Sequence, residues 1–467
     1  MFKLFILFSL LTTNLHAVIS HSPKIVIVGA GLAGLTTGYR LSEMGHDVEV
    51  YEARNRLGGR VFTVMLGDEP AELGGQSLLD GGNSSNILAL IKELDLKLES
   101  EKRAIHTYFV ADGDIIDTKP LLEKYGFAPN TLQEKLQEIS SSAKNMKEVL
   151  LQLFDESEVL YQFFWIRLAA YEGLEPESLS LHYIPTLYHS MLGGISMAHQ
   201  SSNHETNYIH RMSLKGGNAQ LVNKLAEKLG ERIHLNQPLS SIEKADGKYL
   251  LQFKSGSQVT ADIVVLAMPC SVYNDIDIDS KVIPAEQRKA IESIKYGTNA
   301  KILVPTTNHP QAQGAYTNGR MLSYHQGKFA HLYYVSEHSR FHEGTIQETF
   351  DKDFPMVKQL YQLPEDMDAL VMAKDETYKK YFGPVGYSWP NDPYVKGSYS
   401  CISAGQEELL TSMETIGDEK VKTLFAPIDN TLFFAGEHAS ILLDFGGTME
   451  AAVESGERTA RLIKSLN

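Results

Sequence analysis

The feature that most constrains this chain is a β-branched segment that runs straight into three closely spaced glycines. Residues 24–34 read Lys-Ile-Val-Ile-Val-Gly-Ala-Gly-Leu-Ala-Gly, and apolar side chains at helical spacing follow them. A strand, a glycine turn and a helix in this order are typical of a dinucleotide-binding site. Gly29 permits the tight turn, Gly31 lets the backbone approach a pyrophosphate, and Gly34 lets helix and strand pack closely. The start of the helix directs its amide groups at the phosphates.

A second strand is predicted over residues 46–51, and it ends at Glu52. An acidic residue about 20 positions after such glycines binds the ribose hydroxyls of a dinucleotide. A glycine turn alone would not be specific. The strand, the helix and the acid together predict a dinucleotide site at the start of the fold.

Length and charge bound the remaining possibilities. The chain has 467 residues, 43% of them hydrophobic and 22% charged, which excludes a peptide hormone, a collagen-like fibre and a disordered chain. At roughly 100 to 200 residues per domain, two or three domains are expected. The net charge of -15 argues against a nucleic-acid partner. Cys270 and Cys401 are the two cysteines, so there is at most one disulfide, and we predict no metal site.

Residues 1–20 have the layout of a secretory signal peptide, with Lys3 before an apolar run at 4–11 and then polar residues. Cleavage after Ala17 or after Ser20 fits equally well; the alternative is a buried N-terminal strand or helix. The apolar run is far shorter than the roughly 20 residues that span a bilayer. We therefore expect a secreted or periplasmic protein with no stable membrane anchor.

After Glu52 the chain reads Ala-Arg-Asn-Arg-Leu-Gly-Gly-Arg-Val over residues 53–61. With this extension the sequence resembles the flavin-containing amine oxidase superfamily, which includes monoamine, polyamine and L-amino-acid oxidases. The resemblance implies FAD rather than NAD. It also implies that the segment wraps the pyrophosphate, through Arg54, Gly58, Gly59 and Arg60. Judged by residue type alone, the two arginines would be solvated surface charges.

Two further segments resemble parts of the same family. Residues 72–76, Glu-Leu-Gly-Gly-Gln, match the stretch that passes beside the flavin ring, which implies that Gly75 and Gln76 contact the cofactor. Residues 238–242 match the stretch whose backbone meets the adenine, and this implies a contact from Leu239.

The C-terminal part carries the family's last cofactor segment. Gly436-Glu-His follows a predicted strand, and the resemblance implies that Glu437 holds the ribityl chain. Residues 446–458 predict a glycine entry into a helix, which implies contacts from Thr448 and Met449 at the pyrimidine edge of the flavin. A helix N-terminus carries roughly half a positive charge, so this placement favours a reduced flavin.

Two residues are implied to act in catalysis. Lys301, in the segment Tyr-Gly-Thr-Asn-Ala-Lys-Ile, matches the family lysine that holds a water against flavin N5; without the family it would be a surface charge. Tyr399 matches one aromatic wall before the flavin; the alternative is a tyrosine of the core. With Trp389 and Thr448, Tyr399 is predicted to line the substrate pocket.

Three departures from the family narrow the prediction. Monoamine oxidases carry a cysteine that bonds the flavin, but Ser398 stands here, which implies noncovalent FAD. The tyrosine that forms the second aromatic wall in those enzymes is replaced here by Thr448. L-amino-acid oxidases carry a carboxylate-binding arginine where this chain has Ser77. Because a buried carboxylate without such a partner is costly, an amine is favoured over an amino acid as substrate.

The predicted fold class is α/β, or α+β overall, with a Rossmann-like FAD-binding domain interleaved with a substrate domain of mixed sheet and helices. The FAD-binding domain comprises residues 21–76, 212–281 and 419–467, and the substrate domain comprises residues 77–211 and 282–418. Within these, we predict a largely helical stretch at 77–211, a helix from Met212 to Gly230, and strands at 301–304 and 329–335. Leu150, Leu151, Leu153, Phe154, Leu160, Phe163 and Phe164 are predicted core residues.

The resemblance implies an oxidoreductase, an FAD-dependent amine oxidase. It would transfer a hydride from a primary or secondary amine, including polyamines, to flavin N5, release an imine, and be reoxidised by molecular oxygen to hydrogen peroxide. The expected partners are a small-molecule amine, oxygen and a second copy of the chain in a homodimer. An L-amino-acid oxidase and a non-catalytic flavin-binding module are the alternatives.

Overall fold

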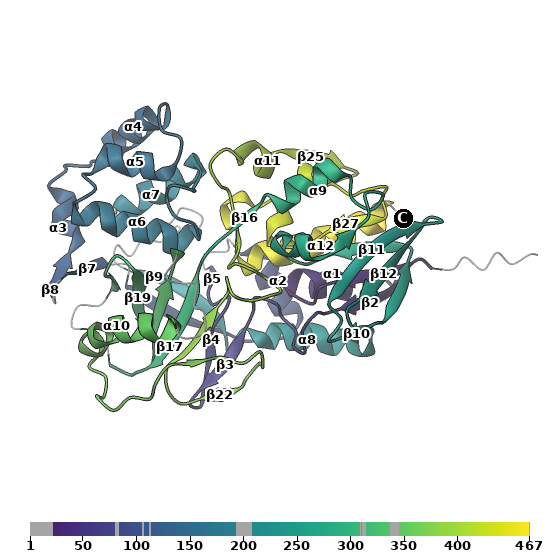
Figure 1. Cartoon of the computed structure of the whole chain (residues 1–467), viewed down its shortest axis with the longest axis horizontal. Coiled ribbons are helices and arrows are strands. Elements are labelled where there is room, and N and C mark those ends of the chain that lie inside the picture. Colours follow the sequence, from purple (N-terminus) through teal and green to yellow (C-terminus); the bar gives the residue numbers. More distant parts are fainter. Residues whose placement is uncertain are drawn as a thin grey trace, which may run out of the picture.

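The computed structural model of the protein describes residues 22–79, 84–104, 107–111, 114–192, 208–308, 310, 314–336 and 345–466. The predicted signal peptide, residues 1–20, lies outside the described residues. The described part has two regions, one built around a parallel sheet and one built around a larger mixed sheet with a group of helices beside it (Figure 1). Within these ranges, no helix combines the length and the hydrophobicity needed to cross a bilayer.

The first region is organised by a five-stranded parallel sheet whose strands come from three distant parts of the chain. Parallel strands are covered on both faces, and the central strands are accordingly almost continuously apolar and buried. In spatial order the strands are β10 (Ile233–His234), β2 (Asp47–Tyr51), β1 (Lys24–Val28), β14 (Ile263–Leu266) and β27 (Leu432–Phe434).

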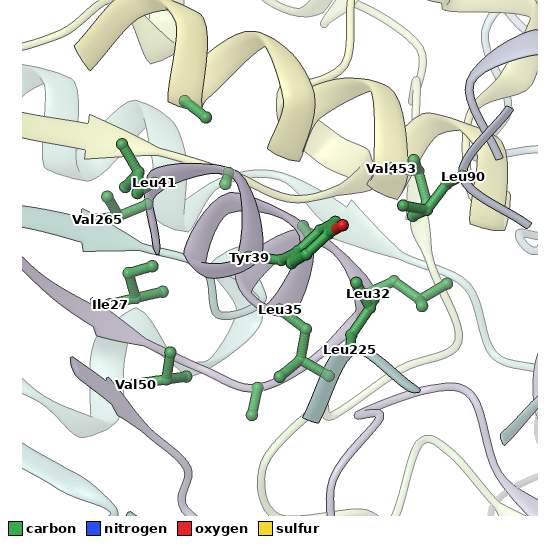
Figure 2. Packing of buried hydrophobic residues seen from close by; sticks show 14 of the residues in the cluster. Ile27, Leu32, Leu35, Tyr39, Leu41, Val50, Leu90, Leu225, Val265 and Val453 are labelled. Carbon is green, nitrogen blue, oxygen red and sulfur yellow. The ribbon is translucent and has the colours of Figure 1, made fainter. Parts of the chain in front are cut away.

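Alternating side chains of these strands build two separate cores, because successive residues of a strand point to opposite faces. Ile27 and Val265 belong to the core that contains the helices, and Figure 2 shows them with Leu35 of the first helix. Val26 and Val264 belong to the core of the opposite face. The helices are α1 (Leu32–Glu43), α2 (Ser85–Glu93), α8 (Ala219–Leu229) and α12 (Met449–Leu466). The opposite face carries the sheet β13 (Gln258–Ala261), β12 (Lys248–Phe253), β11 (Leu239–Ala245) and β15 (Asp277–Ile278).

The second region contains an eight-stranded sheet with helix α10 (Thr345–Tyr361). Two predicted strands, at 301–304 and 329–335, are confirmed as β17 and β20, which pair antiparallel. The strand order is β21 (Val371–Met372), β23 (Val385–Ser388), β17 (Ala300–Pro305), β20 (Phe329–Tyr334), β19 (Met321–Gln326), β18 (Ala315–Thr317), β7 (Thr107–Ala111) and β8 (Asp114–Asp117).

The stretch predicted to be largely helical contains a group of helices on one side of the molecule (upper left in Figure 1). They are α3 (Thr118–Glu123), α4 (Pro129–Ser140), α5 (Met146–Leu153), α6 (Val159–Glu172) and α7 (Ile184–Met191). The prediction missed strands β6 (Leu98–Ala104), β7 and β8, which pair with strands distant in sequence or with each other. It was also wrong for Leu151, whose exposed fraction is 43% on the outer side of α5, whereas the other predicted core residues of this stretch are buried.

The helix predicted from Met212 begins seven residues later, with α8 at Ala219. Residues 208–214 form strand β9 instead, because β9 pairs with β6 (Leu98–Ala104) and with β5 (Leu78–Leu79). The remaining short elements are β3 (Thr63–Leu66), β4 (Glu69–Glu72), α9 (Ala285–Glu292), β16 (Lys295–Tyr296), β22 (Lys380–Tyr381), β24 (Ser400–Cys401), α11 (Glu407–Thr411), β25 (Met413–Ile416) and β26 (Glu419–Lys422).

Candidate active site

The described residues enclose a cavity of about 870 Å³ that touches both regions. Val28, Tyr51, Ala267 and Gly436, at or just beyond the carboxyl ends of parallel strands, line it. In open α/β sheets, ligands bind in the crevice at this edge. All of the predicted cofactor, catalytic and pocket residues line the cavity except Gly34. The chain therefore brings these residues, from positions 29 to 449, to one site.

The glycine turn is shaped by close backbone contacts. Gly29 has a φ of +109°, and a Cβ there would lie 2.7 Å from the carbonyl oxygen of Ala267. A Cβ on Gly34 would lie 2.0 Å from the carbonyl oxygen of Gly29, so Gly34 has its place in the packing of α1 rather than in the cavity wall. Gly31 is different, because a Cβ there would meet nothing within 4 Å. Its missing side chain leaves open space in the cavity.

Glu52 is buried beside this turn, with an exposed fraction of 6%. One carboxylate oxygen accepts a hydrogen bond from the amide of Ala30 at 2.8 Å, and the other accepts one from the amide of Arg54 at 3.0 Å. Burial raises the pKa of Glu52 above its usual value, although these two amides oppose the shift. A carboxylate has about four acceptor positions, so capacity remains for the hydroxyls of a ribose.

Arg54 is buried and held by two carboxylates that the sequence did not suggest. Its guanidinium pairs with Asp392 and, at 3.2 Å, with Asp375, and it stacks on the ring of Tyr394. Arg54 therefore links the nucleotide-binding region to residues 375–394. The expected role of Arg54 beside a pyrophosphate stays a prediction, but the alternative of a solvated surface charge is wrong.

Arg60, whose side chain is 23% exposed, and the buried Glu437 form the second ion pair of the cavity, 2.8 Å apart. Glu437 also accepts hydrogen bonds from the amide and the hydroxyl of Ser400, at 3.1 and 2.7 Å, and from the amide of Gly447 at 3.2 Å. Burial would raise the pKa of Glu437, but the charge of Arg60 and the hydrogen bonds from Arg60 and the Ser400 hydroxyl hold it below its usual value. The carboxylate is thus ionised and fixed in position.

The N-terminus of α12 also lines the cavity, through Thr448 and Met449. The hydroxyl of Thr448 accepts a hydrogen bond from the amide of Ala451 at 3.2 Å and donates one to the carbonyl of Phe445 at 2.7 Å. This hydroxyl acts as an N-terminal helix cap, and the positive end of the helix macrodipole faces the cavity.

Lys301 lies on β17 with an exposed fraction of 2%. Its ammonium donates a hydrogen bond to Gln76 Oε1 at 2.6 Å and lies 5.2 Å from the ring centre of Tyr333. The hydroxyls of Tyr324 and Tyr333 lie 3.1 and 3.0 Å from the same Gln76 oxygen. We call Gln76, Tyr324 and Tyr333 the acceptor cluster. The two tyrosines were missed by the sequence analysis.

The other predicted pocket residues are held by backbone carbonyls. The hydroxyl of Tyr399 donates to the carbonyl of Tyr171 at 2.8 Å, and its ring lies against Gly447, where a Cβ would come within 2.6 Å of the ring. The indole of Trp389 donates a hydrogen bond to the carbonyl of Leu73 at 3.0 Å, and the exposed fraction of Trp389 is 5%. Trp389 therefore contributes only an edge to the wall.

The two cysteines are free and buried. Cys401 donates a hydrogen bond to the carbonyl of Glu172 at 3.0 Å and is not among the residues that line the cavity. Ser398, which stands at the position of the family's flavin-bonding cysteine, does line it. Neither cysteine is thus at the cavity wall.

Glu72 lies behind the cavity wall and supports Gln76. Its carboxylate accepts hydrogen bonds from the Thr63 hydroxyl and, at 2.7 Å, from the amide of Asn218. The side-chain amide of Asn218 in turn donates to the carbonyls of Gly75 and Gln76, at 2.9 and 2.8 Å. Burial raises the pKa of Glu72 to about 7, against the opposing effect of these hydrogen bonds and of the Lys301 charge.

The raised pKa of Glu72 predicts a pH-dependent stability. Its pKa is about 7 in the folded protein and 4.5 ordinarily, so its contribution to the free energy of unfolding is lost as the pH rises from 4.5 through 7. The loss amounts to roughly 3 kcal/mol at most. Glu72→Gln should therefore become more stable relative to the wild type over this pH interval. Urea unfolding of both proteins at several pH values measures this; Glu414→Gln, at an exposed position of β25, is the control and should show no such trend.

The parallel sheet, the glycine turn and the buried acid are typical of a protein that binds a dinucleotide cofactor. Residues of the second region form the rest of the cavity wall. The family model described as "Flavin containing amine oxidoreductase" matches residues 32–464, and the chain belongs to this family. The predicted α/β fold of the FAD-binding type is confirmed. As the description states, the proteins of this family are flavin-containing amine oxidoreductases.

Individual relatives are distant. The chain is 26% identical over 458 residues to "Lysine-specific histone demethylase 1 homolog 2" of Arabidopsis thaliana, with 94% of this chain covered but only 58% of that protein. It is 24% identical to an L-amino-acid oxidase of Crotalus adamanteus, covering 95% of this chain and 87% of that one. The solved structure of cyclohexylamine oxidase from Brevibacterium oxydans superimposes with a TM-score of 0.70 at 18% identity, covering 96% and 100% of the two chains, which shows the shared fold.

Proposed function

We propose that this protein is an amine oxidase with noncovalent FAD, which oxidises a primary or secondary amine to an imine and passes the electrons to oxygen. The observation that carries the proposal is the buried Lys301 ammonium beside Gln76, in the same cavity as the glycine turn. When bound, FAD supplies a ring that accepts a hydride from the amine and that oxygen regenerates, yielding hydrogen peroxide.

The residues present fit FAD. The open space beside Gly31 and the free acceptor positions of Glu52 suit a pyrophosphate and a ribose. The fixed carboxylate of Glu437 suits the hydroxyls of a ribityl chain, and the N-terminus of α12 suits the electron-rich pyrimidine edge of a reduced flavin. The burial of Cys401 away from the cavity supports noncovalent binding.

The chain's own residues then orient the substrate and hold a proton donor. Lys301 keeps an ammonium directed at Gln76 in a site shielded from solvent, where the electrostatic interactions of a charge are stronger than in water. Tyr399 presents an aromatic wall held by the carbonyl of Tyr171. The amine must be neutral to lose a hydride, so the proposal includes activity that rises above neutral pH.

An L-amino-acid oxidase is the second candidate, supported by the relative from Crotalus adamanteus. It is less favoured, because Ser77 lines the cavity where that class has its carboxylate-binding arginine. In the described part of the wall the arginines are Arg54 and Arg60, and both are paired with carboxylates. A non-catalytic flavin-binding module is the third candidate. Export through residues 1–20 and a homodimer stay predictions.

Anaerobic titration tests the proposal. Purified protein with bound FAD is mixed with monoamines, polyamines and L-amino acids, and its visible flavin absorbance is followed before air is admitted. We expect bleaching by at least one amine, followed by recovery of the absorbance with release of hydrogen peroxide. Bleaching by L-amino acids alone would establish the second candidate, and a flavin that stays oxidised with every compound would leave the flavin-binding module.

A further inference from the structure

We propose that residues 392–396 form a clasp over the nucleotide half of the bound cofactor, and that FAD enters and leaves when the clasp opens at its Lys396 end. The clasp reads Asp-Pro-Tyr-Val-Lys and follows β23 of the eight-stranded sheet. The amide of Lys396 donates a hydrogen bond to the carbonyl of Asp392 at 2.8 Å, which folds the clasp into a turn. The inference rests on the proposed function, because it takes noncovalent FAD from it and adds how that cofactor is retained.

The first anchor of the clasp is buried. The side chains of Asp392 and Arg54 have exposed fractions of 0% and 3% and form an ion pair. Asp392 also accepts hydrogen bonds from the Tyr387 hydroxyl at 2.5 Å and from the amide of Tyr394 at 2.8 Å. Because breaking a buried ion pair leaves an uncompensated charge, we expect this end of the clasp to stay closed.

The second anchor is partly exposed. Lys396 pairs with Asp275 at 2.6 Å, and the two side chains have exposed fractions of 42% and 38%. Beside this pair, the hydroxyl of Ser271 donates a hydrogen bond to the carbonyl of Val395. An ion pair at this exposure contributes little to stability, because water and salt screen it. The clasp therefore opens more readily at Lys396 than at Asp392.

The two anchors lie on opposite sides of the glycine turn. Arg54 follows β2, whereas Asp275 ends the 3-10 helix Cys270–Asp275, which follows β14. Strands β2 and β14 are parallel to β1 and flank it, so the segments that follow these three strands leave the sheet at one edge. The segment that follows β1 is the glycine turn. A clasp tied to both flanking segments therefore crosses this edge at the glycine turn.

The clasp also forms part of the cavity wall there. The cavity is lined both by the glycine turn and by the clasp, through Gly29, Gly31, Pro393, Tyr394, Val395 and Lys396. Pro393 and Lys396 are at the same time exposed to solvent. The clasp is thus a thin wall between solvent and the part of the cavity beside the glycine turn.

The groups around the clasp suit a nucleoside diphosphate. A glycine turn of this kind favours a pyrophosphate. The contacts of Arg54 with Asp392 and Asp375 use two of the five N–H donors of a guanidinium, one on each terminal nitrogen. The ring of Tyr394 lies 5.1 Å from the same guanidinium and lines the cavity beside it. The nucleotide half of FAD is therefore the part that the clasp covers.

Two variants distinguish a clasp from a simple effect of charge. Asp275→Asn and Lys396→Met both break the exposed ion pair, but they change the local charge in opposite directions. FAD release from the FAD-bound protein, followed by flavin fluorescence after dilution, should be about 2- to 5-fold faster in both variants, the range of one exposed ion pair. If the two charges acted only on the anionic pyrophosphate, Asp275→Asn would slow the release and Lys396→Met would speed it.

A charge exchange and a matched control complete this experiment. Asp275→Lys combined with Lys396→Asp restores an ion pair and should return the release rate towards that of the wild type. Lys248→Met removes an exposed lysine that pairs with Asp262 at 2.7 Å outside the cavity wall. This control should release FAD at the rate of the wild type.

Uptake and a smaller ligand separate the clasp from the proposed function. The pair of Lys396 and Asp275 is made within the protein, so breaking it should speed the uptake of FAD by the apoprotein by the same factor as the release and leave the dissociation constant unchanged. Surface plasmon resonance on immobilised apoprotein measures both rates. ADP, which carries only the nucleotide half, should show the same acceleration in both variants, whether or not any amine is oxidised.

Three results would each overturn the inference: release rates that change in opposite directions in the two variants, release rates equal to that of the wild type in both, or an apoprotein that does not bind ADP. A protein whose FAD and ADP rates respond as expected, but whose flavin no amine bleaches, would contradict the proposed function and leave the clasp established.

Discussion

Gly31→Val should give a folded protein that binds FAD markedly more weakly than the wild type. Gly31 precedes α1 with φ of -73° and ψ of 177°, a conformation that any L-residue adopts. A Cβ at this position meets no protein atom within 4 Å, so the first carbon of the new side chain fits the free protein without a clash. The same space is where a pyrophosphate would approach the backbone. Overpacking of this kind costs about 1–3 kcal/mol, which weakens FAD binding by roughly 10- to 100-fold.

Gly34→Ala is the contrasting variant, because its Cβ would lie 2.0 Å from the carbonyl oxygen of Gly29. It should lower the free energy of unfolding of the apoprotein, whereas Gly31→Val should not. Urea unfolding of the apoproteins and equilibrium titration with FAD measure the two effects separately. If Gly31→Val bound FAD as tightly as the wild type, the pyrophosphate would not lie at this turn.

The glycine turn and the strand that precedes it were predictable because their interactions are local. Gly29, Gly31 and Gly34 lie within six positions, and Glu52 closes the same turn through the amide of Ala30. β1 was predicted for a similar reason, since its apolar run is continuous and buried on both faces. Such features can be predicted from the periodicity of strands and helices and from the geometry of one turn.

The missed residues depend on contacts between distant segments. Gln76 meets Tyr333 across 257 positions, and Arg54 meets Asp392 across 338. Tyr324 and Tyr333 lie on adjacent strands, but only the register of β19 with β20 brings their hydroxyls together. The two-residue turn at Gly327 and Lys328 fixes that register, and the sequence analysis did not use this local signal. Strand β9, predicted as helix, was missed because its partner β6 lies more than 100 positions earlier.

Lys301→Met should keep FAD and lose most of the rate at which oxygen reoxidises the reduced flavin. The ammonium is buried and donates to Gln76 Oε1 at 2.6 Å, and methionine has a similar length without the charge. Removing one preorganised donor from a shielded site lowers a rate by about 100- to 1000-fold. Stopped-flow mixing of photoreduced protein with oxygenated buffer measures the reoxidation directly and does not depend on the substrate.

The same substitution should raise the pKa of Glu72 further, because the charge of Lys301 opposes the effect of burial on that carboxyl. The pH interval over which Glu72 destabilises the fold would then extend to higher pH, and urea unfolding of Lys301→Met against the wild type detects this shift. Lys380→Met is the matched control, since this lysine lies on β22 outside the cavity wall and pairs with Asp68 at the surface. Lys380→Met should change neither the rate of flavin reoxidation nor the pH interval over which Glu72 destabilises the fold. If Lys301→Met reoxidised as fast as the wild type while Glu72 still shifted, Lys301 would support the electrostatics of the Glu72 network without taking part in the reaction with oxygen.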